Sequence, residues 1–352
     1  MQEAPSSAGS STQDSTLALL SLRLVTGWLF FSALWRRFVL EPEKMVPDAA
    51  GYVGEKFNHF LPHAIGVRGL LDWLVRHPEV LHPFLVVFTV LEGAAGLGLM
   101  LGLLTRAAAA GVVMLSGGIL LGAGWIGSTC LDEWQIGVLG IAGGISVMLG
   151  GAGRFGLDAA LTSRFPRLRQ SRAFALLASG SLPLRPGIVR RGGIALAGAT
   201  LALTLATNQI FFGGVWGKLH NHSVRPHVTI SAAELDQAGA LRLKLARDGG
   251  PDTYGAFIVD IAILDGASKP VHGWDARALA SLPASAITNH YLVKVRPGPH
   301  GLVLPLGSVA DVVLPIPPGV PLPGRYRVRV SDVSGAMWDA GLEIAPRLAG
   351  RE

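Results

Sequence analysis

The stretch "LEGAAGLGLMLGLL", residues 91–104, decides the fold of this chain. It consists of apolar and small side chains, with Glu92 as its one charge. A helix of this composition has no polar face to turn toward water, and its length of roughly 20 residues with its flanks predicts a membrane span. The glycines and alanines let helix backbones approach closely in lipid, where tight packing takes over from the hydrophobic effect. "AAAAGVVMLSGGILLGAG" (107–124) and "GVLGIAGGISVMLGG" (137–151) have the same character.

The overall composition agrees with a membrane protein. Half of the residues are apolar and 15% are charged, whereas about 25% charged residues are usual in a soluble domain. Five stretches are long enough to cross a bilayer as helices: 17–35, 84–104, 107–126, 135–152 and 192–212. We predict a four-helix membrane bundle over 17–160 and a fifth, tethering helix over 192–212. Residues 1–16 are rich in Ser and Thr, carry no Lys or Arg, and are predicted to be a disordered tail rather than a signal peptide.

Charge distribution predicts the orientation. The segment between the fourth and fifth helices, centred on a loop at 161–191, sets eight arginines against the single acid Asp158. The positive-inside rule places this loop in the cytoplasm of a cell bounded by an inner (plasma) membrane. The N-terminus is then cytoplasmic as well, and the first and third connections and all residues after 213 face outward. The eight arginines are Arg154, Arg164, Arg167, Arg169, Arg172, Arg185, Arg190 and Arg191.

The composition changes after residue 213. "GAFIVDIAILDG" (255–266) and "GRYRVRVSDVSG" (324–335) are rich in β-formers, and the second alternates apolar residues with arginines. Such alternation is typical of half-buried strands, and turns rich in Pro and Gly separate the runs. We therefore predict an outward, all-β, sandwich-like domain over 213–352. A single cysteine in the chain allows no intrachain disulfide.

Several function classes lack their signals. The pI near 9.8 comes largely from the arginine-rich loop, so it does not indicate nucleic-acid binding. All ten histidines fall outside the expected spans, where they cannot ligate a haem inside the bundle, and no metal-spaced Cys/His set is present. We expect neither haem nor metal, and a redox role would require a diffusible, lipid-soluble carrier.

Two charges are expected within spans, Arg23 in the first helix and Glu92 in the second. A charge in the bilayer costs roughly 2.5–3.5 kcal/mol on insertion scales, and such residues usually pair. One interpretation is an Arg23–Glu92 ion pair that joins two helices. The other is a proton relay or ligand for a quinone head group. At the inner end of the bundle Arg106, Arg154 and Asp158 are expected to form a cluster that fixes helix ends.

The outward side carries further candidates. His59 and His63 are four residues apart, which would place them on one face of a short interfacial helix; they either contact the membrane surface or exchange protons with a quinone. A cationic group near the outer leaflet either contacts lipid head groups or attracts a small anion. Its members are Arg36, Arg37, Lys218, His220 and Arg225.

The stretch "GSTCLDEW" (127–134) is expected to be a short outward connection between the third and fourth helices. Adjacent acids raise the pKa of a thiol, so Cys130 is either a small buried residue or a nucleophile that nearby cations activate. Asp132 and Glu133 are candidates to accept protons during an oxidation. Trp134 is a candidate substrate-binding residue.

The residues also resemble a known family. "GWLFFSALW" (27–35), "STCLDEWQIG" (128–137) and "GAGRFGLD" (151–158) are similar to DoxD, a membrane subunit of thiosulfate:quinone oxidoreductase within the wider DoxX-like family. "GVWGKLHNHSVRP" (214–226) and "LVLPLGSVADVVLP" (302–315) resemble the DoxA subunit. The order of the motifs looks like a fusion of the two subunits.

The resemblance implies that thiosulfate is oxidised to tetrathionate at the outer face and that a membrane quinone accepts the electrons. The alternative is a non-catalytic DoxX-type membrane anchor whose β-domain binds another extracytoplasmic protein. The partners expected are thus thiosulfate, quinone and the lipid bilayer. Association of the chain with copies of itself, and the identity of the sulfur anion, stay open at this point.

Overall fold

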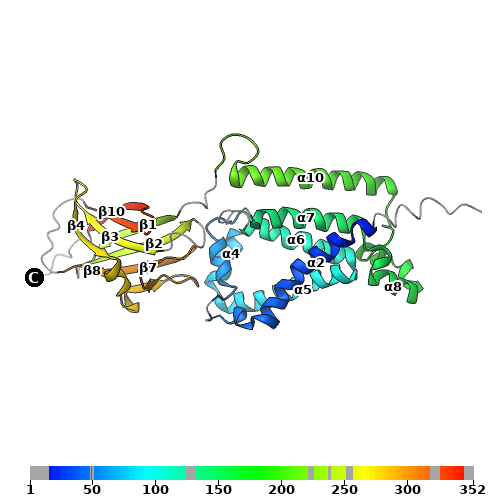
Figure 1. The fold of residues 1–352 in the computed structure, drawn as a ribbon, viewed down its shortest axis with the longest axis horizontal. Coiled ribbons are helices and arrows are strands. Elements are labelled where there is room, and N and C mark those ends of the chain that lie inside the picture. Colours follow the sequence, from blue (N-terminus) through cyan, green and yellow to red (C-terminus); the bar gives the residue numbers. More distant parts are fainter. Residues whose placement is uncertain are drawn as a thin grey trace, which may run out of the picture. The chain divides into compact units, whose positions relative to one another are not determined.

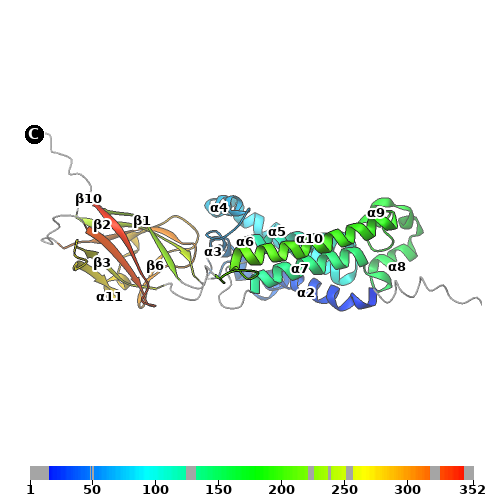
Figure 2. The same ribbon diagram turned by 90° about the horizontal axis from the view of Figure 1, so that it is seen from above.

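The computed structural model describes residues 16–47, 49, 51–123, 132–220, 226–236, 239–250, 257–317 and 326–344. The chain divides into two compact units, one formed by 1–53, 79–124 and 132–220, and the other by 54–78, 125–131 and 221–352. The first unit is helical, and the second consists mainly of β-strands (Figures 1 and 2).

The helical unit confirms the predicted membrane fold. Within the described residues, five helices are long and apolar enough to cross a membrane. They centre on α2 (Leu20–Trp35), α5 (Pro78–Leu101), α6 (Thr105–Ala123), α7 (Asp132–Gly150) and α10 (Pro186–Phe212). The fifth helix, α10, runs alongside α7 (Figure 1). The short helices α8 (Leu157–Arg164) and α9 (Arg172–Leu177) lie between α7 and α10 in the chain.

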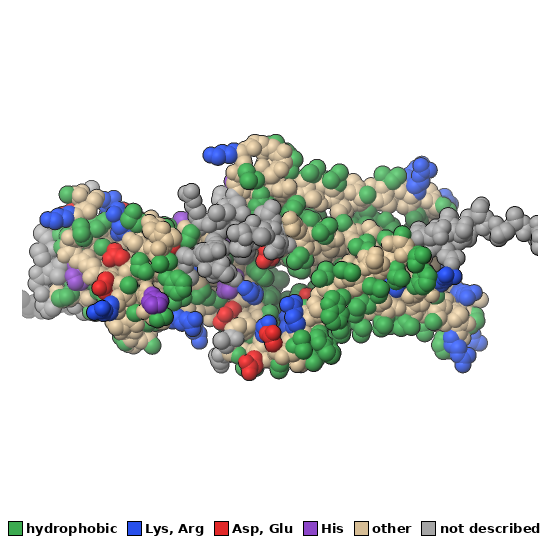
Figure 3. Space-filling view, viewed as in Figure 1, with side chains coloured by type: hydrophobic (Ala, Val, Ile, Leu, Met, Phe, Trp, Pro, Cys, Tyr) green, Lys and Arg blue, Asp and Glu red, His purple; other side chains and the backbone are tan. Residues whose placement is uncertain are grey.

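The outer surface of this unit is apolar. Met114, Leu139 and Ile194 are 78%, 70% and 66% exposed, and hydrophobic side chains cover the flank of the bundle in Figure 3. Lys and Arg side chains gather at the end that holds α8 (Figure 3). An apolar belt between two ends that carry charged residues is what a bilayer selects.

Helices α2 and α5 pack through glycines. A Cβ on Gly27 would lie 2.7 Å from the carbonyl oxygen of Gly96, and a Cβ on Gly96 would overlap the backbone nitrogen of Phe31. A Cβ on Gly93 would overlap the side chain of Leu34. Because these contacts involve backbone atoms, the helices touch as closely as lipid-embedded helices with small residues can. Positions 27, 31 and 34 of α2 thus face positions 100, 96 and 93 of α5, as expected for two antiparallel helices.

The connection between α2 and α5 contains a folded segment, of which the sequence predicted only a short helix around His59. Residues 54–78 carry α3 (Glu55–Phe60) and α4 (Arg68–Arg76) and belong to the same compact unit as the β-domain. One face of α4 buries Leu71, Leu74 and Val75. We call residues 54–78 the insert.

The β-domain has two sheets, as predicted. One has the strand order β5 (Ile287–Asn289), β8 (Val309–Pro315), β2 (Ala240–Gly249) and β1 (His227–Leu235). The other has the order β10 (Met337–Ile344), β9 (Tyr326–Asp332), β3 (Phe257–Leu264), β7 (Gly301–Val303) and β6 (Arg296–Gly298), with β4 (Pro270–Asp275) beside β3. Neighbouring strands within each sheet are antiparallel, and a short parallel pairing of β1 with β10 joins the two.

Alternating residues of both sheets fill one core. Leu241, Leu243 and Leu245 of β2 meet Ile261 of β3 and Val328 of β9 in a single buried cluster. The helix α11 (Ala276–Ala280) adds Leu279 to this cluster. The alternation read from 324–335 is confirmed, since Tyr326, Val328 and Val330 are buried whereas Arg327 is exposed.

Candidate functional site

A largely buried ion pair joins the π-helical turn Arg36–Leu40, which continues α2, to α5 within the helical unit. Nη1 of Arg37 lies 2.7 Å from Oε2 of Glu92 and donates a second hydrogen bond, of 3.0 Å, to Oγ1 of Thr89. The side chains of Arg37 and Glu92 are 19% and 10% exposed, and Thr89 is fully buried. We call these three residues the Glu92 site.

The local fold explains why Arg37 reaches this position. The glycine contacts align 27, 31 and 34 of α2 with α5, and the next step on that face falls near residue 37. There the α-helix changes into a π-helical turn, Arg36–Leu40, in which the N–H of Glu41 donates to the carbonyl of Arg36. Such wider turns are often found at functional sites because they redirect a side chain.

The expected Arg23–Glu92 pair is wrong. Arg23 instead donates to the carbonyl oxygens of Ala152, at 3.2 Å, and Phe155, at 2.9 Å. Arg23 and Arg37 are 14 positions apart on one helix, about 21 Å along its axis, which exceeds the reach of one arginine side chain. The signal that could have identified Arg37 was the spacing of Gly27, Phe31 and Leu34 toward it, together with its unexplained charge on the outer side.

The Glu92 site has unused hydrogen-bonding capacity. Within the described part of the chain, Arg37 uses one of its three guanidinium nitrogens, and Glu92 receives a hydrogen bond on one oxygen. A guanidinium with spare donors beside a carboxyl group fits a ligand that carries a carbonyl oxygen and gains a proton. Ionisable groups among membrane helices that face the bundle interior mark sites of this kind by default.

A second buried cluster, at the α8 end, is held mainly by backbone groups, although Nε of Arg23 has no hydrogen-bond partner among the described residues. Asp158 accepts hydrogen bonds from the N–H groups of Leu104, Thr105 and Ser179, at 2.7, 3.1 and 2.8 Å, and from the Thr105 hydroxyl. Arg106 donates to the carbonyls of Met148, Ala175, Ala178 and Gly180. The expected cluster of Arg106 and Asp158 therefore exists, and Arg23 belongs to it. Arg154 stacks on the ring of Phe155 at 5.0 Å.

The two histidines lie in the insert. His59 is half-buried on α3, and His63 is buried. The helix α3 ends at Phe60, so His63 lies in the turn beyond it and the two do not share a helical face as predicted. Both belong to the unit of the β-domain, whereas Glu92 belongs to the helical unit.

The acids of the 127–134 stretch occupy a helix end rather than a loop. The helix α7 begins at Asp132, so Asp132 and Glu133 lie in its first turn, where negative charge is favoured by the helix dipole. The indole N–H of Trp134 donates to Oγ1 of Thr207 at 3.0 Å, and its ring meets Phe212 edge-on. Trp134 thus holds α10 against α7. Cys130 lies outside the described residues.

The structure describes four of the five candidate anion-binding cations. Arg36 is exposed, with its Nε donating to the carbonyl of Ser32 at 3.4 Å. Lys218 is exposed, and His220 is half-buried over Gly213, where α10 ends in a left-handed residue. Arg37 is committed to Glu92, and Arg225 lies outside the described residues. Among the described residues, no group of three His, Cys, Asp or Glu side chains is placed to hold a metal ion.

A five-helix apolar unit with an internal carboxylate–arginine pair, followed by a two-sheet β-domain, defines an integral membrane protein with an attached all-β domain. Comparison with family models assigns both parts. Residues 18–185 match the TQO small subunit DoxD, and residues 211–341 match the TQO small subunit DoxA. The chain belongs to these two thiosulfate:quinone oxidoreductase (TQO) subunit families, which it carries in tandem. The resemblance drawn from the sequence is thereby confirmed, and with it a membrane function of the thiosulfate:quinone oxidoreductase type.

Proposed function

We propose that this protein oxidises two thiosulfate ions to one tetrathionate and passes the two electrons to a membrane quinone. The reaction joins two sulfane sulfurs by one new S–S bond, and the quinone takes up two protons with the electrons. The observation that carries the proposal is the tandem occurrence of DoxD and DoxA on one chain. The Glu92 site supports it, because it supplies an acid among membrane helices where a lipid-soluble quinone is bound.

The quinone half of the reaction is assigned to Arg37, Thr89 and Glu92. The free donors of Arg37 would hold a quinone carbonyl, and Glu92 would supply a proton to the oxygen that gains electrons. A carboxyl group that donates this proton must be re-protonated from water. The π-helical turn at Arg36–Leu40 ends next to the exposed residues Glu41 and Lys44, and we propose that water re-protonates Glu92 from this end.

The sulfur half is assigned to the side of the membrane that holds the β-domain. With five spans, the connection 41–77, the connection 124–131 and the chain after α10 all lie on one side. The contact of Asn58 in the insert with Val293 and Gly307 of the β-domain supports this common side independently. The arginine-rich segment around α8 and α9 then faces the cytoplasm, and the β-domain faces outward.

Cys130 is the candidate for a covalent route. Its thiolate would form an S–S bond with one thiosulfate as two electrons leave for the quinone. A second thiosulfate would then attack the sulfane sulfur, release tetrathionate and restore the thiolate, as in thiol–disulfide exchange. Arg36, Lys218, His220 and Arg225 would offset the charge of the dianions, and Asp132 or Glu133 would take up the proton that the Cys130 thiol loses when it becomes the thiolate. The other route couples two thiosulfates directly at the quinone without a covalent intermediate.

The test uses the purified full chain with thiosulfate and a soluble quinone analogue, and it follows quinone absorbance and tetrathionate formation. Glu92→Gln keeps the shape of the side chain but removes the proton, and we expect a loss of about 100-fold in quinone reduction. Glu79→Gln is the matched control, since Glu79 is exposed at the start of the same helix.

Each outcome has a distinct meaning. Equal rates for Glu92→Gln and Glu79→Gln would remove Glu92 from the reaction. Full activity of Cys130→Ser would eliminate the covalent route and leave direct coupling. A chain that is inactive alone and becomes active with an added subunit would support the anchor role instead.

A further inference from the structure

The insert is held to the β-domain by a complete interface. Its centre is Asn58, which is fully buried. The Asn58 side chain donates through Nδ2 to the carbonyl of Gly307 and accepts through Oδ1 from the N–H of Val293, both at 3.4 Å. A side-chain amide that bridges two strand-connecting loops satisfies backbone groups that would otherwise be buried without partners.

At the same point the two backbones touch. Gly307 has a φ of +78°, and a Cβ placed on it would overlap the carbonyl oxygen of Asn58. The loop that carries Gly307 is fixed from the other side by Arg247, a fully buried arginine whose backbone pairs with Ser308 and Gly307. The guanidinium of Arg247 also donates to the carbonyl of Leu304 at 3.2 Å. The β-domain therefore presents a rigid surface to the insert.

Apolar residues surround this centre. Leu61, Ala64, Leu71 and Val75 of the insert form one buried cluster with Leu292 and Tyr291 of the β-domain packed against it. These six residues come from segments more than 200 positions apart in the sequence, so the cluster forms only when the two segments meet.

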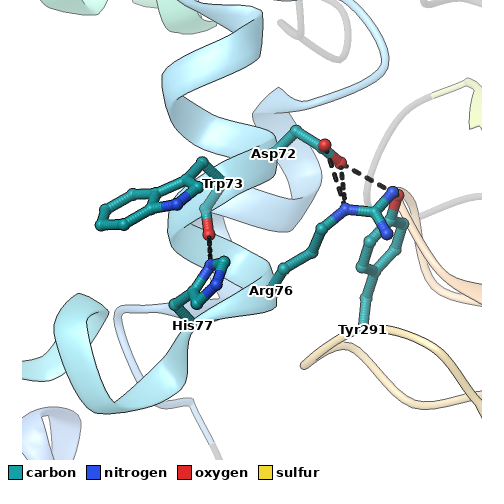
Figure 4. A network of polar contacts seen from close by, with 5 residues as sticks. All are labelled: Asp72, Trp73, Arg76, His77 and Tyr291. Atoms are coloured by element: carbon teal, nitrogen blue, oxygen red, sulfur yellow. Dashed lines mark hydrogen bonds and ion pairs between the residues drawn. The ribbon is translucent and has the colours of Figure 1, made fainter.

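A polar clamp closes the rim (Figure 4). Nε of Arg76 lies 3.0 Å from both carboxylate oxygens of Asp72, and Nη2 of Arg76 donates to the Tyr291 hydroxyl at 2.9 Å. The hydroxyl in turn donates to Asp72 at 3.1 Å, and the guanidinium carbon lies 5.2 Å from the ring centroid. Burial, followed by the charge of Asp72, raises the pKa of Tyr291, so the phenol keeps the proton that it donates.

A buried, largely apolar core with a polar, partly exposed rim is the anatomy of a protein–protein interface. Every insert residue in it lies within the DoxD match, 18–185, and every β-domain residue lies within the DoxA match, 211–341. We infer that residues 54–78 are the docking element by which the DoxD part of this chain binds its DoxA part, and that this interface holds the β-domain without the covalent link through α10.

The test severs that link after folding. A protease recognition sequence is inserted between His220 and Pro226 in the full chain, which is purified in detergent, bound to a resin through a tag on the helical part, and cut. We expect the wild-type β-domain to stay bound. In Gly307→Ala, the clash with Asn58 should make its release about tenfold faster or more, which corresponds to about 1.4 kcal/mol.

The matched control is Gly335→Ala. Gly335 has a φ of +83° and no neighbour within 4 Å of a Cβ, so this variant carries the same backbone strain without the clash. Release of the wild-type β-domain on cutting would overturn the inference. Equal release from Gly307→Ala and Gly335→Ala would overturn it as well.

A second pair of variants, with milder substitutions, is used in case Gly307→Ala fails to fold before cutting. Arg76→Gln removes the clamp, and Arg68→Gln removes an exposed arginine from the same helix. We expect release about two- to fivefold faster from Arg76→Gln than from Arg68→Gln, and equal release would contradict the inference. Neither thiosulfate nor quinone enters this assay, so its failure leaves the proposed reaction unaffected.

Discussion

Two buried charge clusters lie along the first membrane helix, formed by α2 and its π-helical continuation. They differ in the groups that neutralise their charges. At Arg23 the partners are backbone groups, since arginines donate to carbonyls of helix ends and Asp158 accepts from N–H groups. At Arg37 the partners are side chains of α5, and part of the guanidinium and of the carboxylate has no partner in the described chain.

The difference separates a structural cluster from a candidate reactive one. Backbone groups are fixed, so a cluster that is held mainly by them fixes helix ends and cannot exchange those partners for a ligand without disturbing the fold. A side-chain pair with open donors can exchange a partner or a proton at a smaller cost in structure. The burial of a charge alone, which the two clusters share, does not make this distinction.

The largest expected effect tests the structural side of the comparison. Asp158→Ala leaves the buried N–H groups of Leu104, Thr105 and Ser179 without their acceptor, and it should lower the free energy of unfolding by about 3–5 kcal/mol. Thermal unfolding in detergent, with Glu79→Ala as the exposed control, measures it. If both variants unfold at the same temperature, the cluster around Asp158 does not stabilise the fold.

The packing that brings Arg37 to Glu92 is tested next. A Cβ on Gly96 would lie 2.5 Å from the carbonyl oxygen of Gly27, so Gly96→Ala must separate α2 from α5. We expect a loss of about 1–3 kcal/mol in stability together with loss of quinone reduction. Gly118→Ala in α6 meets no atom within 4 Å and should keep both, and an equal result for the two would contradict the role of the glycine contacts.

A smaller effect distinguishes the two arginines directly. Arg37→Lys keeps the charge but loses the forked donor geometry, and it should lower quinone reduction about tenfold with little change in unfolding temperature. Arg23→Lys should lower the unfolding temperature and leave quinone reduction nearly unchanged, because two carbonyl groups at a helix end are held by the forked guanidinium of Arg23. Rates per folded molecule and unfolding temperatures, measured on both variants, give the crossed pattern; identical patterns would remove the contrast between the clusters.

The smallest effect comes from an exposed pair, which serves as the reference for both clusters. Arg329 donates to both carboxylate oxygens of Asp339, at 2.7 and 2.8 Å, and this hydrogen bonding holds the pKa of Asp339 below its ordinary value. A lowered folded-state pKa stabilises the fold above about pH 3.9, and the gain is lost as the pH falls through the folded value. Asp339→Asn should therefore have a slightly lower unfolding temperature than the wild type at pH 7 and the same unfolding temperature near pH 2. A difference that persists near pH 2 would contradict this assignment.

The sequence predicted the elements well because their signals are local. Apolar runs marked the five spans, and the alternation around Tyr326, Val328 and Val330 marked a strand. The sequence also placed Asp158 with Arg106 at the same helix ends, those near α8. Local signals misplaced Asp132 and Glu133 in a loop, since a helix can begin at an acid that favours its dipole.

The partners across the fold were outside the reach of such signals. Arg23 was paired with Glu92 because both are charged and lie within spans. The actual partner of Glu92 depends on how the first two membrane helices are aligned along their lengths. The insert gave no sign that it packs with the β-domain, because Asn58 and Gly307 are about 250 positions apart.

The amino-acid sequence by itself determined whether each segment lies in lipid or in water, since this depends on the hydrophobicity and charge of the helix or strand. It also determined the family, through short motifs that are each formed by consecutive residues. Only the tertiary structure decided that Arg37 faces Glu92 and that residues 54–78 join the β-domain. These contacts depend on glycine-sized approaches between distant backbones, and such approaches are settled by the packing of the whole chain.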